Sequence, residues 1–317
     1  MTTPSASLRV VVGVILVAVV AAAMTAVRRV PVAVSTADIA ELWENPGDIT
    51  ARDLRWGRGG QALHPAADVD YQFKAIDAVG YSAGYEVIDP QGREWDVKTG
   101  DEGQPEVVAS RLLWAVGYHQ PIVYFVPDWT LKNGPVPKPF GGRFRLSSDH
   151  VGLGDWSWSD NPFKGTRQLK GLIVANLMLN NWDLKPSNNK LLSVPMATGA
   201  RRWFVVQDIG ASFGKTAWPI GNRNRVEDYE RQDFVIGVEN GRVQFDYQAR
   251  HRDLLQDITP DDVIWISQLL ARLSDQQLAD AFRAAALSDA VSARYIRKLT
   301  SKIQKGLSLR TNTVDRR

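Results

Sequence analysis

Hydrophobic and polar positions divide the chain into an apolar amino-terminal run, a region of short strands and a region of longer helices. From residue 71, short segments rich in β-branched and aromatic residues are separated by turn residues, which predicts strands. These segments are residues 73–79, 85–88, 94–98, 121–126 and 144–146. Residues 105–118 instead carry apolar side chains at helical spacing, which predicts one helix among the strands.

The second half of the chain has a different pattern. Residues 131–166 are rich in Gly, Pro and Trp and predict a connection that crosses between two lobes. A buried helix is expected at 167–179. The remaining expected elements are strands at 191–194 and 202–207, a hairpin at 234–247, and three helices that begin near Thr259, Ser274 and Ser288.

Residues 10–27 form an apolar run of about 18 residues, the length that spans the hydrocarbon core of a bilayer. A cleaved signal peptide, with Ala21-Ala22-Ala23 as its small-residue site, is the alternative interpretation. The run is long for the core of a signal peptide, and only Arg9 precedes it as a basic residue. We therefore favour an uncleaved single-pass anchor in the lipid bilayer. The flanking charges are too even to fix its orientation.

Five segments follow from these patterns. They are a tail at 1–9, a transmembrane helix at 10–27, a juxtamembrane linker at 28–69, an N-lobe at 70–148 and a C-lobe at 149–317. The linker is rich in Pro, Gly, Asp and Arg, and one short helix is expected in it near residues 36–43.

Composition limits the chemistry further. With 317 residues and 44% hydrophobic content, the chain can bury one large core or two coupled lobes. The absence of cysteine excludes disulfides, thiolate catalysis and cysteine-based zinc sites. The net charge is only +3 and the basic residues are scattered, so no nucleic-acid partner is expected.

The strongest chemical signal lies just after the predicted helix at 167–179. Asp183 is followed by Lys185 and Asn188, and Asp208 comes twenty residues later in Val-Val-Gln-Asp-Ile-Gly. Phosphoryl transfer from ATP uses residues of these types. Asp183 can orient a hydroxyl and accept its proton, and Lys185 can neutralise the moving phosphoryl group. Asn188 and Asp208 can hold Mg²⁺ or Mn²⁺ against the phosphates.

A second group of candidates lies in the predicted N-lobe. Lys98 ends a predicted strand, and Glu106 lies near the start of the next helix, with Glu102 as the rival partner. A buried lysine held by a helix glutamate can reach the α- and β-phosphates of ATP. Gly80 and Gly84 flank a loop between two strands, where backbone N–H groups can approach the phosphates. A plain hairpin turn is the alternative for that loop.

The run Asp-Leu-Lys-Pro-Ser-Asn at 183–188 resembles the catalytic loop of Ser/Thr protein kinases, and Asp208-Ile209-Gly210 resembles their Asp-Phe-Gly. Asn181-Trp182 replaces the usual His-Arg, and no Ala-Pro-Glu follows. These departures look more like the atypical branch of the superfamily: HipA kinases, spore-coat CotH kinases, secretory-pathway kinases and phosphoinositide lipid kinases. The resemblance covers residues 70–250. It implies an α+β fold with two lobes, a small β-rich N-lobe with one helix and a larger, mainly helical C-lobe.

The resemblance further implies a membrane-anchored atypical kinase that transfers the γ-phosphate of ATP to a hydroxyl, on a protein Ser or Thr. AMP transfer to a protein, phosphorylation of a small molecule, and a catalytically silent pseudokinase scaffold are the alternatives. The acceptor is left open by the sequence. A cytoplasmic body is expected, because ATP is abundant on that side of the membrane.

Overall fold

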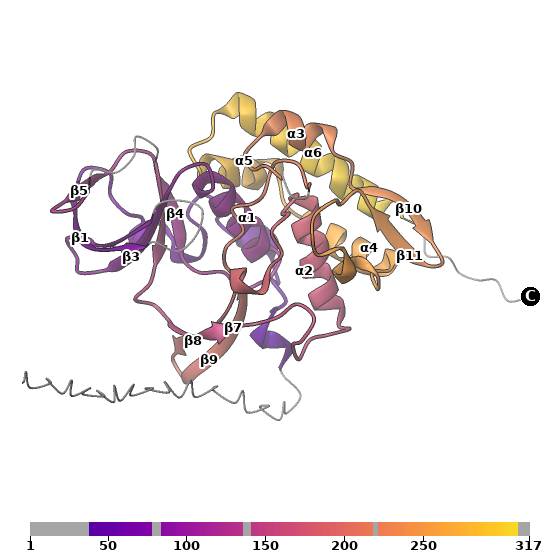
Figure 1. Ribbon diagram of the computed structural model, residues 1–317, viewed down its shortest axis with the longest axis horizontal. Coiled ribbons are helices and arrows are strands. Elements are labelled where there is room, and N and C mark those ends of the chain that lie inside the picture. Colours follow the sequence, from indigo (N-terminus) through magenta and orange to yellow (C-terminus); the bar gives the residue numbers. More distant parts are fainter. Residues whose placement is uncertain (1–37, 78–83, 136–140, 218–220, 310–317) are drawn as a thin grey trace, which may run out of the picture. The chain divides into compact units, whose positions relative to one another are not determined.

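The computed structural model describes residues 38–77, 84–135, 141–217 and 221–309. In these ranges the strands are β1 (Asp70–Asp77), β2 (Gly84–Ile88), β3 (Glu94–Thr99), β4 (Val123–Val126), β5 (Thr130–Lys132), β6 (Gly142–Leu146), β7 (Val151–Asp155), β8 (Asn189–Met196), β9 (Gly199–Val206), β10 (Val235–Glu239) and β11 (Arg242–Phe245). The α-helices are α1 (Gly103–Ala115), α2 (Arg167–Met178), α3 (Val226–Arg231), α4 (Pro260–Leu270), α5 (Asp275–Arg283) and α6 (Asp289–Leu307). This mixed α+β class, with a sheet lobe and a set of helices, confirms the predicted class (Figure 1).

A six-stranded sheet forms the first lobe, in the order β4-β6-β3-β2-β1-β5. The strands pair antiparallel except β1 and β5, which pair parallel. One face is apolar: Tyr71, Trp95 and Phe144 are fully buried in a core of their own. On β3 and β6 the residues between these apolar positions are charged. They lie on the opposite face, since side chains of a strand alternate between its faces.

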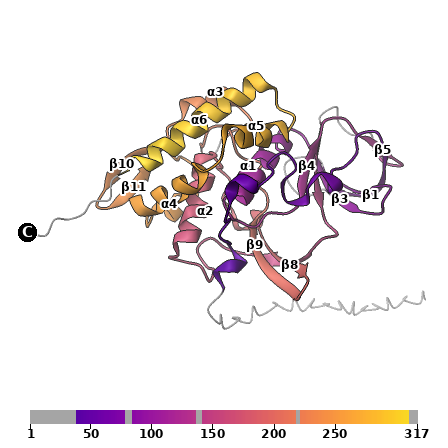
Figure 2. The ribbon, with the colours of Figure 1, turned by 180° about the vertical axis from the view of Figure 1, so that it is seen from behind.

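Helix α1 connects the sheet with the helical part of the fold. It contacts β4 and β6 and also α5, and Figure 1 shows it between the two groups of elements. In the helical part, α4 packs on both α2 and α6, as Figure 2 shows from behind. Helix α2 is buried over most of its length because it lies inside a cluster that the other helices surround. Such a helix is apolar on nearly every side.

Within residues 131–166, the strand expected at 144–146 is confirmed as part of β6. The expectation of a plain connection in the rest of this range is wrong at β7. All of β7 is exposed, so its sequence shows no half-buried pattern. In addition, the described part of the expected linker, residues 38–69, is packed. Its 3-10 helices are η1 (Ile39–Glu41), η2 (Ile49–Ala51), η3 (Gly57–Gly59) and η4 (Gln61–Leu63).

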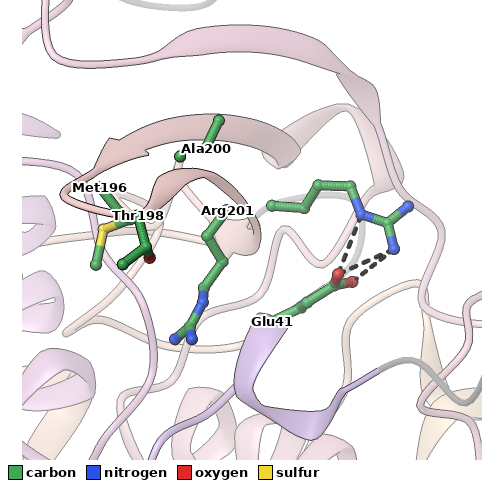
Figure 3. A pocket seen from close by; sticks show the side chains of 7 residues that line it. Glu41, Met196, Thr198, Ala200 and Arg201 are labelled. Carbon is green, nitrogen blue, oxygen red and sulfur yellow. Dashed lines mark hydrogen bonds and ion pairs between the residues drawn. The ribbon is translucent and has the colours of Figure 1, made fainter.

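The side chains of this packed segment explain why it is not a free linker. Leu42, Ile49 and Leu54 are completely buried in the same core as α2. Glu41 of η1 accepts hydrogen bonds from Arg202 of β9 at 2.9 to 3.1 Å, drawn as dashed lines in Figure 3. The pocket in that view, at the β8–β9 turn, is lined by none of the predicted site residues.

No helix within the described ranges is long and apolar enough to cross a membrane. The predicted transmembrane helix at residues 10–27, like the tail at 1–9, lies outside those ranges.

Candidate nucleotide and metal site

The loop that follows α2 carries three of the predicted residues. Asn180 adopts a left-handed conformation (φ 55°), which ends the helix, and the Asn181 backbone N–H donates to the Asn176 carbonyl at 2.9 Å. Asparagine tolerates this conformation better than most residues. Leu184 is buried, whereas the side chains of Asp183 and Lys185 are 26% and 50% exposed.

Within this loop, the three predicted side chains contact one another. The Lys185 ammonium donates to the Asp183 carboxylate at 2.8 Å. Asn188 Nδ2 donates to the Asp183 backbone carbonyl at 2.7 Å and to its carboxylate at 3.2 Å. Because the amide nitrogen of Asn188 is used as a donor, its Oδ1 is the atom suited to bind a cation.

The hairpin of β8 and β9 brings Asp208 back to this loop. Asn189 pairs with Val206 in the register of the two strands. As a result the backbone carbonyl of Asn188 accepts from the Gln207 N–H at 2.9 Å and from the Asp208 N–H at 3.2 Å. The predicted metal ligands Asn188 and Asp208 are therefore neighbours in space.

Lys98 on β3 completes the group. Its ammonium lies 3.1 Å from Oδ2 of Asp208. Burial alone would raise the pKa of the Asp208 carboxyl, but the positive charges of Lys98 and Arg145 outweigh it and hold the pKa below its ordinary value. Asp208 is thus a carboxylate at neutral pH, the form that binds a divalent cation.

The sequence predicted that Glu106 pairs with Lys98, but in the structure it does not. It is almost fully buried (1% exposed) on α1, and its carboxylate forms ion pairs with Arg143 and Arg145 of β6. The rival Glu102 forms an ion pair with Arg223. The expected lysine–glutamate pair is therefore replaced by an arginine–glutamate cluster.

Arg145 is the residue through which this cluster reaches the segment that carries Asp208. It contacts Glu106, lies 3.2 Å from the Asp96 carboxylate, and donates to the Gln207 carbonyl at 3.3 Å. Burial would lower its pKa, but the negative charges of Glu106, Asp96 and Asp208 outweigh it and raise the pKa. The sequence prediction missed Arg143, Arg145 and Asp96. Their signal was present as charged residues at alternate positions of two strands.

Of the two glycines of the predicted phosphate loop, Gly84 lies within the described residues. Gly84 begins β2 opposite Lys98, and a Cβ there would lie 2.9 Å from the Cβ of Asp77, so the two strands meet closely at this point. Gly80 lies outside the described residues, and the role of both glycines stays a prediction.

Gly210 has a clearer structural role. A Cβ at this position would lie 2.8 Å from the backbone oxygen of Glu102, at the start of α1. The absence of a side chain thus lets the segment after Asp208 approach the helix that carries Glu106. Gly210 therefore allows the segment that carries Asp208 to pack closely against the start of α1.

A divalent cation fits the predicted ligand pair. One carboxylate and one amide oxygen are hard oxygen donors of the kind that Mg²⁺ and Mn²⁺ prefer. Magnesium commonly binds one or two carboxylates together with substrate phosphates and water. No cluster of three or more His, Cys, Asp or Glu able to hold a metal occurs in the described ranges.

No family model matches the chain, and no curated protein matches it. Among solved structures, it is similar to the crystal structure of the proinflammatory kinase CtkA of Helicobacter pylori, with a TM-score of 0.45 and 11% sequence identity. The similarity covers 75% of this chain and 94% of that one. Neither the geometry above nor the function proposed below depends on this likeness.

Proposed function

We propose that the chain is an atypical kinase that transfers the γ-phosphate of ATP to a hydroxyl, on a protein Ser or Thr. One observation supports this most: Lys98, Asp208 and the loop of Asp183 and Asn188 come from three separate parts of the sequence and form a continuous series of contacts. A lysine, two cation ligands and a partly exposed carboxylate are the groups that phosphoryl transfer requires.

Each residue has a distinct part in the proposed reaction. Asp183 accepts the proton of the acceptor hydroxyl while the hydroxyl oxygen bonds to the γ-phosphorus, and the bond from that phosphorus to the β–γ bridging oxygen breaks to release ADP. Lys185, next to Asp183, neutralises the phosphoryl group as it moves. Lys98 holds the α- and β-phosphates.

Asn188 and Asp208 would hold the metal ion. When bound, Mg²⁺ supplies charge neutralisation for the phosphates. Glu106 acts differently from the usual helix glutamate, because it positions Arg145 rather than Lys98. Arg145 in turn supports the backbone just before Asp208.

Two single variants of the full-length chain test these roles separately. Asp208→Ala removes a metal ligand and is expected to abolish Mg-dependent ATP binding, measured by calorimetry. Asp183→Ala is expected to leave ATP binding within about twofold while lowering turnover at least a hundredfold, the usual scale for loss of a general base. A wild-type chain that binds no ATP in the presence of Mg²⁺ contradicts the proposal.

Transfer of label distinguishes the other reactions that this site could perform. With ATP labelled at the γ-phosphate, label on a protein acceptor supports the proposed reaction. Label transferred only from the α-phosphate would identify an AMP transferase, and label found only on a small molecule would identify a small-molecule kinase. Binding of ATP without any transfer would identify a pseudokinase scaffold.

We further propose that residues 10–27 anchor the protein in the membrane as a single-pass helix, with the catalytic body in the cytoplasm. The support is the length and apolar character of that run. Reporter fusions at the carboxyl terminus test the orientation. A reporter that is active only outside the cytoplasm would overturn it, and release of the chain from membranes by salt or carbonate would overturn the anchor itself.

A further inference from the structure

The segment that follows Asp208 contains an arginine, Arg223, with two contacts that the proposed reaction does not use. Arg223 forms an ion pair with Glu102, the residue just before α1, and both side chains are nearly buried (11% and 10% exposed). Its guanidinium also lies over the ring of Trp182, 5.3 Å from the ring centre. Trp182 directly precedes Asp183, so Arg223 connects the start of α1 with the catalytic loop.

Neighbouring residues make further contacts of the same kind. Trp182 Nε1 donates to the Asn222 carbonyl at 3.1 Å, and Asn224 Nδ2 donates to Gln104 Oε1 on α1 at 2.9 Å. A Cβ at Gly221 would lie 2.7 Å from the Trp182 ring. The segment is therefore packed directly against both the catalytic loop and α1.

The backbone of this segment is also tied to its own beginning. The Asn224 N–H donates to the Ser212 carbonyl at 3.1 Å, and the Arg225 N–H donates to the Phe213 carbonyl at 2.8 Å. These bonds join residues 222–225 to the stretch just after Gly210. Movement of Arg223 would therefore disturb the metal-binding segment as well as the catalytic loop.

We propose that Arg223 is a positioning residue that fixes residues 212–217 and 221–225 in the conformation needed for transfer, by bridging Glu102 and Trp182. In this arrangement the segment needs no added phosphate. Phosphorylation orders a segment by giving it a charged group that pairs with an arginine. Here the segment itself carries the arginine, and a carboxylate at the start of α1 is its partner. This inference rests on the proposed function for its catalytic consequence only.

The nature of the contact explains why it can replace a phosphate. A charge-assisted hydrogen bond is about twice as strong as a neutral one. Screening by salt is weak for side chains as little exposed as Glu102 and Arg223. Arginine is also charged at every physiological pH, so a pH change within that range does not remove the positive charge from this contact.

Hydrogen exchange of the full-length chain tests the structural half of the proposal. In Arg223→Ala, the amides of 221–231 and of the first turn of α1 are expected to exchange at least about tenfold faster, since a hydrogen bond to a charged group is lost. Amides of α2 should exchange as in the wild type. Arg231→Ala is the matched control. Arg231 ends α3, just beyond the segment, is 73% exposed and pairs only locally with Asp228 among the described residues, so its removal should change neither exchange nor turnover.

Kinetics test the catalytic half. Arg223→Ala should lower kcat about tenfold or more and leave the Kd for MgATP within about twofold, and Arg223→Lys, which keeps the charge but loses the planar group, should lie between it and the wild type. Trp182→Leu, which removes the ring without changing any charge, should reproduce the faster exchange if Arg223→Ala does not fold. Phosphatase treatment of the wild type should change neither measurement.

The outcomes separate this inference from the proposed function. Unchanged exchange at 221–231 in Arg223→Ala overturns the role of Arg223, and a loss of wild-type turnover after phosphatase treatment overturns independence from phosphate. An equal loss of MgATP binding and turnover would make Arg223 part of the nucleotide site instead. If the wild type transfers no phosphate, the proposed function fails, while the exchange result still decides whether Arg223 holds the segment.

Discussion

Replacing Arg145 by Met tests the charged cluster between the sheet and α1. The contacts join three positive side chains (Lys98, Arg143 and Arg145) to three negative ones (Asp96, Glu106 and Asp208). Arg145→Met keeps most of the volume but leaves one negative charge in excess. Glu106 is 1% exposed, so this charge cannot regain water. Removing one partner of a buried ion pair costs about 3–5 kcal/mol of the free energy of unfolding.

The double variant Arg145→Met, Glu106→Gln shows whether charge balance is the cause. Glu106→Gln alone leaves an excess positive charge and should cost a similar amount. Together the two changes restore the balance, with Arg143 still beside Asp96. We therefore expect the double variant to be less destabilised than the sum of the single variants, by about 2 kcal/mol.

Urea unfolding followed by tryptophan fluorescence measures these differences, with the wild-type slope as the check on two-state behaviour. Arg242→Met is the control. Its ion pair with Asp257 is long (3.8 Å) and both side chains are well exposed, so its loss should cost less than about 1 kcal/mol. The reasoning is refuted if Arg145→Met costs no more than this control, or if the two changes in the cluster are additive.

Two further predictions concern the segment that contains Asp208 and Gly210. Gly210→Ala places a methyl group 2.8 Å from the Glu102 backbone, so it should lower the free energy of unfolding by about 1–3 kcal/mol and weaken MgATP binding. Gly152→Ala is the control and should be neutral, because there is open space around Gly152. Equal denaturation midpoints for the two variants would contradict this reasoning. The lowered pKa of Asp208 means that its carboxylate stabilises the fold above its ordinary pKa of 3.8 and that this contribution disappears as pH falls through the lower folded value. The wild type should therefore be more stable than Asp208→Asn at pH 6, and the gap should close in acid; a constant gap in denaturation midpoints from pH 6 to pH 3 would show that the carboxylate is not stabilised by Lys98 and Arg145.

The predicted site residues that lie together in the structure are brought together by short stretches of chain. Asp183, Lys185 and Asn188 lie within one loop, so their spacing alone limits how far apart they can be. Asp208 is brought back by a hairpin, and consecutive antiparallel strands are the easiest pairing to expect. For the same reason α2 and the hairpin of β10 and β11 lie where their apolar patterns predicted.

The misassigned residues depend on neighbours that are distant in sequence. β6 pairs with both β3 and β4, so the position of Arg145 beside Asp96 follows from a pairing across about fifty residues. Nothing local in the pattern around Glu106 indicates that arginines, rather than Lys98, will reach it. Leu42 and Ile49 likewise occur in a stretch rich in Pro, Gly and charged residues, and only the core that they enter explains their burial.

Glu106 pairs with Arg143 and Arg145 instead of Lys98, and this affects how the two lobes are coupled. A lysine that pairs with a helix glutamate must divide its three donors between that carboxylate and the phosphates. Here Glu106 has its own partners in Arg143 and Arg145, so α1 can remain docked on β6 whichever group Lys98 binds. The start of α1 is also tied to the segment after Asp208, through Glu102 and Gln104. Because none of these contacts involves Lys98, we expect nucleotide binding to exchange the Lys98–Asp208 pair for phosphate and metal contacts without moving α1. Hydrogen exchange of α1 should then be the same with and without MgATP.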